Sequence, residues 1–288
     1  KGLPVEGVLN WSNGWLPSLF QGTVIRPIEP RILNLQPPRE LQGPVQENYL
    51  QLLGKLNREH FLQHPRELDL QARLTNLELA TQMQIAAQEA LDLGQETKAT
   101  HRMYGMDNPA TQEFGARCLI ARRLVERGVR FVQLFTKNQY WDHHGSIQSR
   151  LPESTTKIDQ PAAALVKDLK QRGLLDSTVV HWGGEMGRLP IAQLTADKDP
   201  KKAGRDHNRN AICTWMAGGG VRAGFDYGQT DDFSFNIVRD PVYVHDLNAT
   251  LLYLLGIDHM RLTHRFQGRD YRLTDVHGNV IHEIIKAG

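Results

Sequence analysis

The sequence predicts an α/β protein, namely an α/β/α sandwich with a mostly parallel sheet, plus a helical insertion. Two observations predict it: stretches with helical periodicity alternate with β-forming stretches after residue 108, and the connections between them are short. The 288 residues, of which 40% are hydrophobic and 23% are charged, are enough for a full-sized core. This composition excludes disordered, collagen-like and disulfide-scaffold proteins.

The charge balance and the hydrophobic pattern exclude two classes of partner. Lys and Arg number 34 against 32 Asp and Glu, which gives a net charge of +2 at pH 7. Nucleic acids and anionic membranes demand clustered positive charge, so neither is expected as the main partner. No run of about 18 apolar residues occurs, and no transmembrane segment is therefore predicted. The two cysteines, Cys118 and Cys213, are compatible with a disulfide or with two free thiols.

Three parts follow one another along the chain. Residues 1–44 are rich in proline and glycine, which disfavour regular helices, so an extended segment packing on the main domain is predicted. Residues 45–108 are predicted to form a helical insertion, because apolar residues recur at three- and four-residue spacing. Pro65 is expected to separate two helices there, and Gly94 to end the second. Residues 109–288 are predicted to form the C-terminal part of the α/β domain.

The order of elements in this last part predicts the sheet. Glycines end the helices, and the stretches that follow are rich in β-forming residues. The predicted strands are 129–135, 177–182 and 211–217, and the predicted helices are 111–127, 156–172 and 245–255. Short connections between helix and strand favour a mainly parallel sheet that is covered by helices.

Polar clusters follow the predicted strands, and the ligands of open parallel sheets bind just beyond strand ends. Asp142 and His144 are two residues apart, so an extended backbone puts both side chains on one side and His143 on the other. A carboxylate and an imidazole that converge in this way form half of a metal site suited to zinc, manganese or iron. A hydrogen-bonded Asp–His pair in a turn is the alternative.

Glu185, Arg188 and His207 are the further candidates. Glu185 follows two glycines that close a strand, so its carboxylate can be a metal ligand or a general base. The planar guanidinium of Arg188 suits phosphate or sulfate oxygens, although a salt bridge with Glu185 explains the pair equally well. His207 is a candidate third metal ligand that Asp206 beside it can orient, and a surface histidine is the alternative.

The chain resembles a bacterial family in the motifs that contain these residues. The matching stretches are 114–132, 141–144, 179–190 and 204–208. They resemble the family known as domain of unknown function 1501, a family of sulfatase-like proteins in the alkaline phosphatase superfamily. The resemblance implies an α/β/α sandwich with metal ions at the strand ends, and hydrolysis of a phosphate or sulfate ester.

The resemblance also implies roles for individual residues. Asp142, His144 and His207 match the ligands of one metal ion, and Glu185 matches the acidic ligand of a second. Met186 stands where the superfamily often has a histidine, which is a departure from its pattern. The implied cofactor is a divalent metal: zinc, calcium, magnesium or manganese.

The expected function is metal-dependent hydrolysis of a sulfate or phosphate ester, in which Arg188 neutralises the charge that grows on the transferred group. The expected substrate is a sulfated or phosphorylated small molecule or polysaccharide, and the family implies a periplasmic or secreted location. The family's first strand and nucleophile segment are not found, so the chain is expected to be the C-terminal part of a longer member. A non-catalytic binding protein on the same scaffold is the alternative function, and a polar network without metal is a third interpretation.

Overall fold

The structure is a computed structural model that describes residues 7–14, 16, 20–33, 35, 38–64, 74, 75, 87, 89–137 and 139–287. The chain divides into two compact units. The first unit comprises Lys1–Tyr140 and Thr156–Ala162, and the second comprises Trp141–Thr155 and Ala163–Gly288. The predicted division into three parts is not tested by this partition and stays a prediction.

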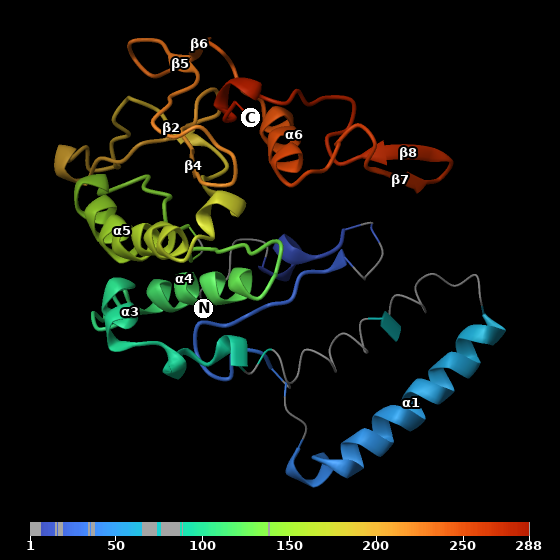
Figure 1. The fold of residues 1–288 in the computed structure, drawn as a ribbon. Helices are drawn as coiled ribbons and strands as arrows, with labels where there is room; N and C mark the ends of the chain where they lie inside the picture. Colours follow the sequence, from blue (N-terminus) through green and yellow to red (C-terminus); the bar gives the residue numbers. More distant parts are fainter. Residues whose placement is uncertain are drawn as a thin grey trace. The chain divides into compact units, whose positions relative to one another are not determined.

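The first unit is helical over much of its described length (Figure 1). Its α-helices are α1 (Pro44–Gln63), α3 (Lys98–Met103) and α4 (Gln112–Glu126), with 3-10 helices at Gly7–Trp11, Arg39–Leu41 and Leu93–Gln95. Proline begins α1, a position at which its missing N–H is not needed. The structure thus confirms a helix at the start of the predicted helical insertion and the helix predicted at 111–127. The helix boundary predicted at Pro65 lies outside the described residues.

Helix α4 supplies much of the core of the first unit. Cys118, Leu119, Ile120 and Ala121 are buried on it, and Tyr104 is buried nearby in the sequence. Both cysteines of the chain are free, and burial raises the pKa of the Cys118 thiol to about 12. Of the two possibilities left open by the sequence, the structure therefore shows two free thiols.

A buried ion cluster joins the start of α3 to the end of α4. Arg122 Nη2 lies 2.7 Å from Glu96 Oε2, and Arg123 contacts the other oxygen of the same carboxylate. Arg123 Nε also donates to Ala90 O at 2.8 Å. The exposed fractions of the side chains are 7% for Glu96, 1% for Arg122 and 4% for Arg123. Each buried charge thus has a partner of opposite sign, which is what makes its burial tolerable.

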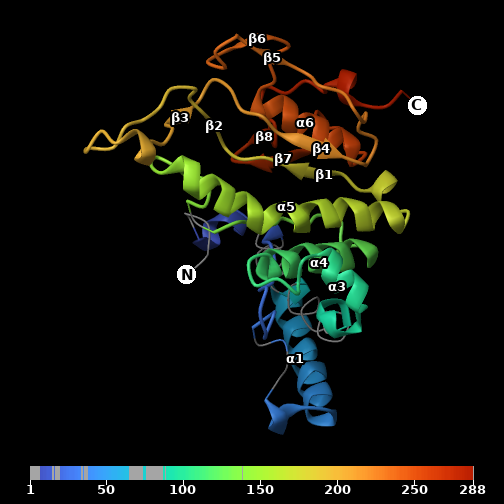
Figure 2. The ribbon, with the colours of Figure 1, turned by 90° about the vertical axis from the view of Figure 1, so that its left-hand side faces the viewer.

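Four short strand pairs, two α-helices and 3-10 helices at Leu175–Ser177, Pro200–Lys202 and His282–Ile284 build the second unit (Figures 1 and 2). The pairs are β1 (Val180–Trp182) with β4 (Trp215–Ala217), β2 (Gly187–Arg188) with β3 (His207–Asn208), β5 (Gln229–Thr230) with β6 (Ile237–Arg239), and β7 (Thr263–Phe266) with β8 (Arg269–Arg272). The helices are α5 (Ile147–Gln171), which has its residues 156–162 in the first unit, and α6 (Val244–Leu254). Helix α6 confirms the helix predicted at 245–255.

Helix α6 is joined to the C-terminal segment by buried polar groups. Asp246 accepts a hydrogen bond from Tyr243 N at the start of the helix, at 3.0 Å, and another from Asn279 N at 2.8 Å. Thr250 Oγ1 accepts from Ile281 N at 3.0 Å. Each acceptor satisfies a backbone N–H that would otherwise be left without a partner.

The predicted α/β/α sandwich with a mostly parallel sheet is wrong. Every strand pair within the described ranges is antiparallel and two-stranded. The stretch 129–135 is not a strand, and its Phe131 is 71% exposed. The stretches 177–182 and 211–217 contain only the three-residue strands β1 and β4, which pair antiparallel with each other. Local β-propensity identified extended backbone, but it carries no information about which segment lies beside it.

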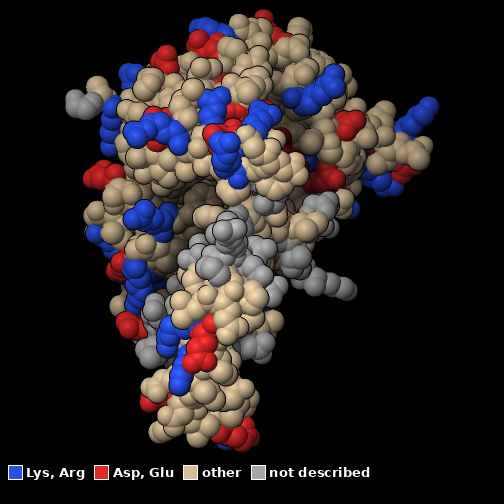
Figure 3. Space-filling view, turned by 90° about the vertical axis from the view of Figure 1, so that its right-hand side faces the viewer, with Lys and Arg blue, Asp and Glu red and all other residues tan. Residues whose placement is uncertain are grey.

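Charges of both signs are mixed on the surface. On the face that Figure 3 views, Lys and Arg side chains and Asp and Glu side chains are both present and lie among one another. In the β7–β8 hairpin, Arg265 pairs with Asp270 and Arg269 pairs with Asp275, each at 3.4 Å. Among the described helices, none combines the length and the apolar character that crossing a lipid bilayer requires.

Replacement of Glu96 by glutamine is expected to destabilise the protein by roughly 3–5 kcal/mol at pH 7, because two buried guanidinium groups lose their counter-charge. Burial by itself would raise the pKa of Glu96, but hydrogen bonds from Arg122 and Arg123 outweigh it and lower the pKa below its ordinary value. The stabilisation is therefore present above the unfolded-state pKa of about 4.3 and is lost as the pH falls through the lower folded-state value. Urea unfolding from pH 7 down to pH 3 measures both effects.

Glu89→Gln is the matched control for this experiment. Glu89 pairs with Arg127 at 3.2 Å, but its side chain is 69% exposed, so the loss expected is within about 1 kcal/mol. Equal losses for Glu89→Gln and Glu96→Gln, or a Glu96→Gln loss that does not shrink toward low pH, would contradict the assigned role of the buried carboxylate.

Candidate metal centre

Three side chains from two distant parts of the sequence meet at one point in the second unit. Asp142 Oδ1 lies 3.0 Å from His144 Nε2 and 2.9 Å from His207 Nε2, and the two nitrogens lie 3.1 Å apart. The exposed fractions of the side chains are 24% for Asp142, 39% for His144 and 41% for His207. The structure therefore brings together three of the four predicted metal ligands and leaves them open to solvent.

Backbone pairing between three segments holds the cluster in place. The antiparallel β2–β3 pair sets Arg188 opposite His207. The chain just before β3 pairs in turn with the loop that carries the other two ligands, since Arg205 N donates to His143 O at 3.0 Å. Residues 203–208 thus lie against both other segments, which fixes the position of His207 relative to the loop.

Gly204 permits the close approach of two of these segments. A Cβ atom at this position would lie 2.1 Å from the carbonyl carbon of His144 and 2.4 Å from the nitrogen of Gly145. Gly204 also exchanges two backbone hydrogen bonds with Gln193, each 2.9 Å long. Any larger residue would force the segments apart, so this glycine has a packing role beside the candidate ligands.

Arg188 connects the cluster to the backbone around it. Its Nη2 donates to Asp142 Oδ1 at 2.8 Å and to Trp141 O at 2.9 Å, and its Nη1 donates to Arg205 O at 3.2 Å. Burial alone would raise the pKa of Asp142, but hydrogen bonds from His207 and Arg188 outweigh it and lower the pKa to about 2. Asp142 is therefore an ionised carboxylate at neutral pH.

Gln193 contacts the far side of the His144 ring. Its Oε1 lies 2.8 Å from His144 Nδ1, and Asp206 Oδ1 lies 3.7 Å from the same nitrogen. A neutral imidazole carries a proton on only one nitrogen, so a proton on Nδ1 that is donated to Gln193 leaves a lone pair on Nε2. Gln193 is therefore placed to favour the tautomer of His144 that binds metal through Nε2.

The sequence interpretation missed Gln193. No pattern singled it out, because it lies in the loop between two motifs and reaches His144 only through the backbone pairing with Gly204. Asp206 was expected to orient the His207 ring, but it accepts a hydrogen bond from the backbone nitrogen of His207 at 2.7 Å.

His143 lies on the other side of the loop, as its position between the two ligands predicts. The residue is only 6% exposed, and its Nε2 has no hydrogen-bond partner among the residues that the structure describes. Burial lowers the pKa of His143, and the charges of Arg188 and Arg150 act in the same direction. His143 is therefore a neutral packing residue of the loop.

The donor chemistry of the cluster fits a divalent cation. Asp142 offers an acceptor-only oxygen and His144 offers a lone pair, yet these two atoms lie only 3.0 Å apart. His207 Nε2 lies within 3.1 Å of both, so three possible ligand atoms face one another. Ligand atoms about 2.0–2.2 Å from one ion lie at most about 4.4 Å apart, and the observed separations are below that limit. Imidazole and carboxylate donors in this combination suit zinc, iron or manganese.

Glu185 is not part of this cluster. Within the described ranges, the residues whose possible ligand atoms all lie within 4.8 Å of one another are Asp142, His144 and His207. Glu185 is exposed, and Arg188 is paired with Asp142 instead of with Glu185. The alternative of a salt bridge within the 185–188 loop is therefore wrong, whereas a role of Glu185 at a second metal stays a prediction.

The protein thus has a candidate metal centre of two imidazoles and one carboxylate. Short antiparallel strand pairs support this centre. A family model described as "Protein of unknown function (DUF1501)" matches residues 1–285. Because this match covers nearly the whole chain, the protein belongs to the DUF1501 family, as the motifs predicted. No curated protein and no solved structure matches the chain.

Replacement of Gln193 by leucine is expected to weaken zinc binding by about 10- to 100-fold, because His144 loses the acceptor that keeps its proton on Nδ1. Isothermal titration of the chelator-treated protein with zinc measures the affinity. The ¹⁵N chemical shifts of His144 in the metal-free protein report the tautomer directly, and Gln193→Leu is expected to shift it away from the Nδ1–H form.

Gln171→Leu provides the matched control, since Gln171 is an exposed residue at the end of α5. Its zinc affinity and its His144 shifts are expected to equal those of the wild-type protein. The same tautomer and the same affinity in Gln193→Leu would show that Gln193 does not position His144.

Proposed function

We propose that the protein is a metal-dependent hydrolase of sulfate or phosphate esters, related to the sulfatase-like enzymes of the alkaline phosphatase superfamily. The observation that carries the proposal is the convergence of Asp142 Oδ1, His144 Nε2 and His207 Nε2 within 3.1 Å of one another. A centre of this kind supplies Lewis acidity that polarises an ester oxygen and lowers the pKa of water. Partial exposure of all three side chains supports access by a substrate.

The three ligand residues have separate tasks in this proposal. Asp142 supplies negative charge, and its lowered pKa keeps that charge available down to strongly acidic pH. His144 and His207 supply neutral nitrogen donors, so the centre retains net positive charge for an anionic ester once a divalent cation is bound.

Arg188 supports recognition of an anionic group. Three of its N–H groups are used within the chain, on Asp142, Trp141 and Arg205. A guanidinium has five N–H groups, so two are available to sulfate or phosphate oxygens next to the ion. In the proposed reaction these donors neutralise charge that develops on the transferred group, while the other three keep the guanidinium fixed.

A non-catalytic metal-dependent binding protein is the second candidate. It is favoured by the position of Glu185, which stands outside the three-residue cluster in the part of the chain that the structure describes. In two-metal hydrolases the two ions stabilise both the attacking and the leaving oxygen. A single metal ion can bind an anionic ester without stabilising both oxygens, so binding does not require hydrolysis.

Metal content and ester hydrolysis separate the two candidates. The protein loaded with zinc or manganese is expected to retain one ion per chain after dialysis and to hydrolyse 4-nitrophenyl sulfate or 4-nitrophenyl phosphate. His207→Gln is expected to lose both the ion and the activity, because one of three ligands is removed. His277→Gln, a change at an exposed histidine elsewhere in the second unit, is expected to keep both.

Retention of the ion without hydrolysis of either ester would favour the binding protein over the hydrolase. Absence of a tightly held ion from the wild-type protein would contradict both candidates and support a polar network without metal. Unchanged activity in Glu185→Ala would exclude Glu185 from the reaction.

A further inference from the structure

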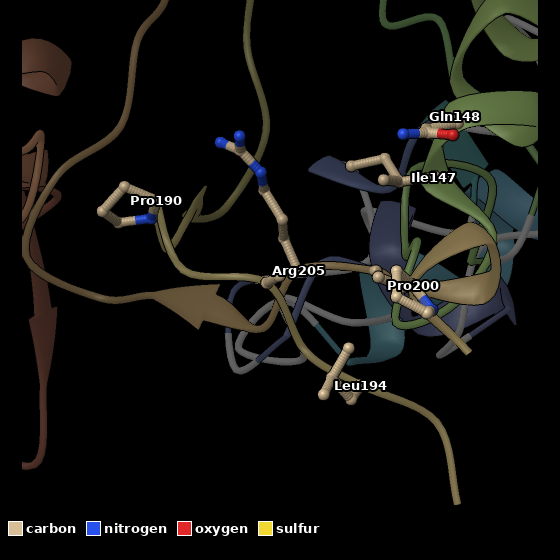
Figure 4. A pocket seen from close by; sticks show the side chains of 9 residues that line it. Ile147, Gln148, Pro190, Leu194, Pro200 and Arg205 are labelled. Atoms are coloured by element: carbon tan, nitrogen blue, oxygen red, sulfur yellow. The ribbon is translucent and has the colours of Figure 1, made fainter. Parts of the chain in front are cut away.

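A pocket of about 310 Å³ is formed by the same segments that carry the candidate metal centre. Pro190 and Leu194 from the loop after β2 line it, together with Ile147 at the start of α5 and with Pro200, Ala203 and Arg205 from the segment before β3. Most of these side chains are apolar, and Arg205 is the charged one. Figure 4 shows the Arg205 side chain extended between Pro190 on one side and Ile147 on the other.

The backbone of Arg205 is held by hydrogen bonds, whereas its side chain makes none with the described residues. Its N donates to His143 O at 3.0 Å, and its O accepts from Arg188 Nη1 at 3.2 Å. Its guanidinium makes no hydrogen bond or ion pair with any residue that the structure describes. A cation without a counter-charge, at the edge of an apolar pocket, is suited to a ligand that carries an anionic group next to apolar atoms.

The pocket adjoins the metal centre. Gly204 and Arg205 both line the pocket, and a Cβ atom at Gly204 would lie 2.1 Å from the carbonyl carbon of His144. The backbone oxygen of Arg205 accepts a hydrogen bond from Arg188 Nη1, the residue that also contacts Asp142. The β2–β3 register sets Arg188 directly opposite His207. The pocket and the candidate centre therefore share the backbone of residues 204 and 205.

We propose that this pocket binds the organic part of the substrate, and that Arg205 binds a second anionic group on it. The inference rests on the proposed function and narrows its substrate class to esters whose organic part combines apolar atoms with a sulfate, sulfonate or carboxylate group. Ile147, Leu194 and the two prolines contact the apolar atoms, while Arg205 supplies a charge-assisted hydrogen bond.

Binding of naphthalene-2-sulfonate to the chelator-treated protein tests the pocket without requiring metal or turnover. Fluorescence titration is expected to show saturable binding to the wild-type protein and about tenfold weaker binding to Arg205→Gln. Arg205→Lys is expected to fall between them, since lysine keeps the charge but not the planar fork. Arg209→Gln, at an exposed arginine nearby in the sequence that does not line the pocket, is the matched control and is expected to bind like the wild type.

Two further probes separate the apolar and the anionic contributions. Neutral naphthalene-2-sulfonamide and inorganic sulfate are each expected to bind more weakly than the sulfonate, because each lacks one of the two features. Ala203→Phe fills the pocket and is expected to abolish binding, and circular dichroism establishes that each variant is folded.

The outcomes distinguish this inference from the proposed function. Equal binding to the wild type and Arg205→Gln, or no saturable binding at all, would overturn the pocket even if metal binding and hydrolysis are found. Sulfonate binding that depends on Arg205 supports the pocket even if the chain holds no ion and hydrolyses no ester.

Discussion

The candidate centre depends on one carboxylate oxygen, Asp142 Oδ1, because His144, His207 and Arg188 all contact it at 3.0 Å or less. These contacts join three segments that are far apart in the sequence. The positive charge of the Arg188 guanidinium offsets the negative charge of the Asp142 carboxylate, which stabilises the contacts between these side chains.

Short stretches of backbone pairing position the candidate ligands in the second unit, without an extended sheet. The β2–β3 pair has only two residues in each strand, yet it sets Arg188 opposite His207. The same segments continue into the pocket, which Arg205 lines. The metal centre and the pocket therefore share one support, and displacement of residues 203–208 would alter both.

The prediction from the sequence was more accurate for the candidate site than for the fold. The spacing of Asp142 and His144 is local and fixes the side that each faces, so their convergence could be read directly. His207 was a candidate ligand from its own polar cluster, and the family motifs placed it in one site with Asp142 and His144, because no local rule connects it to their loop. Gln193 could not be found, because its role arises from pairing with Gly204 across the loop. The sheet was predicted wrongly because strand propensity in 129–135 does not specify a neighbouring strand.

The most direct test of the shared cation is anomalous diffraction from crystals of the zinc-loaded protein at the zinc absorption edge. One strong peak is expected about 2.0–2.2 Å from Asp142 Oδ1, His144 Nε2 and His207 Nε2. No peak there, with the three side chains still hydrogen-bonded directly to one another, would contradict the shared cation.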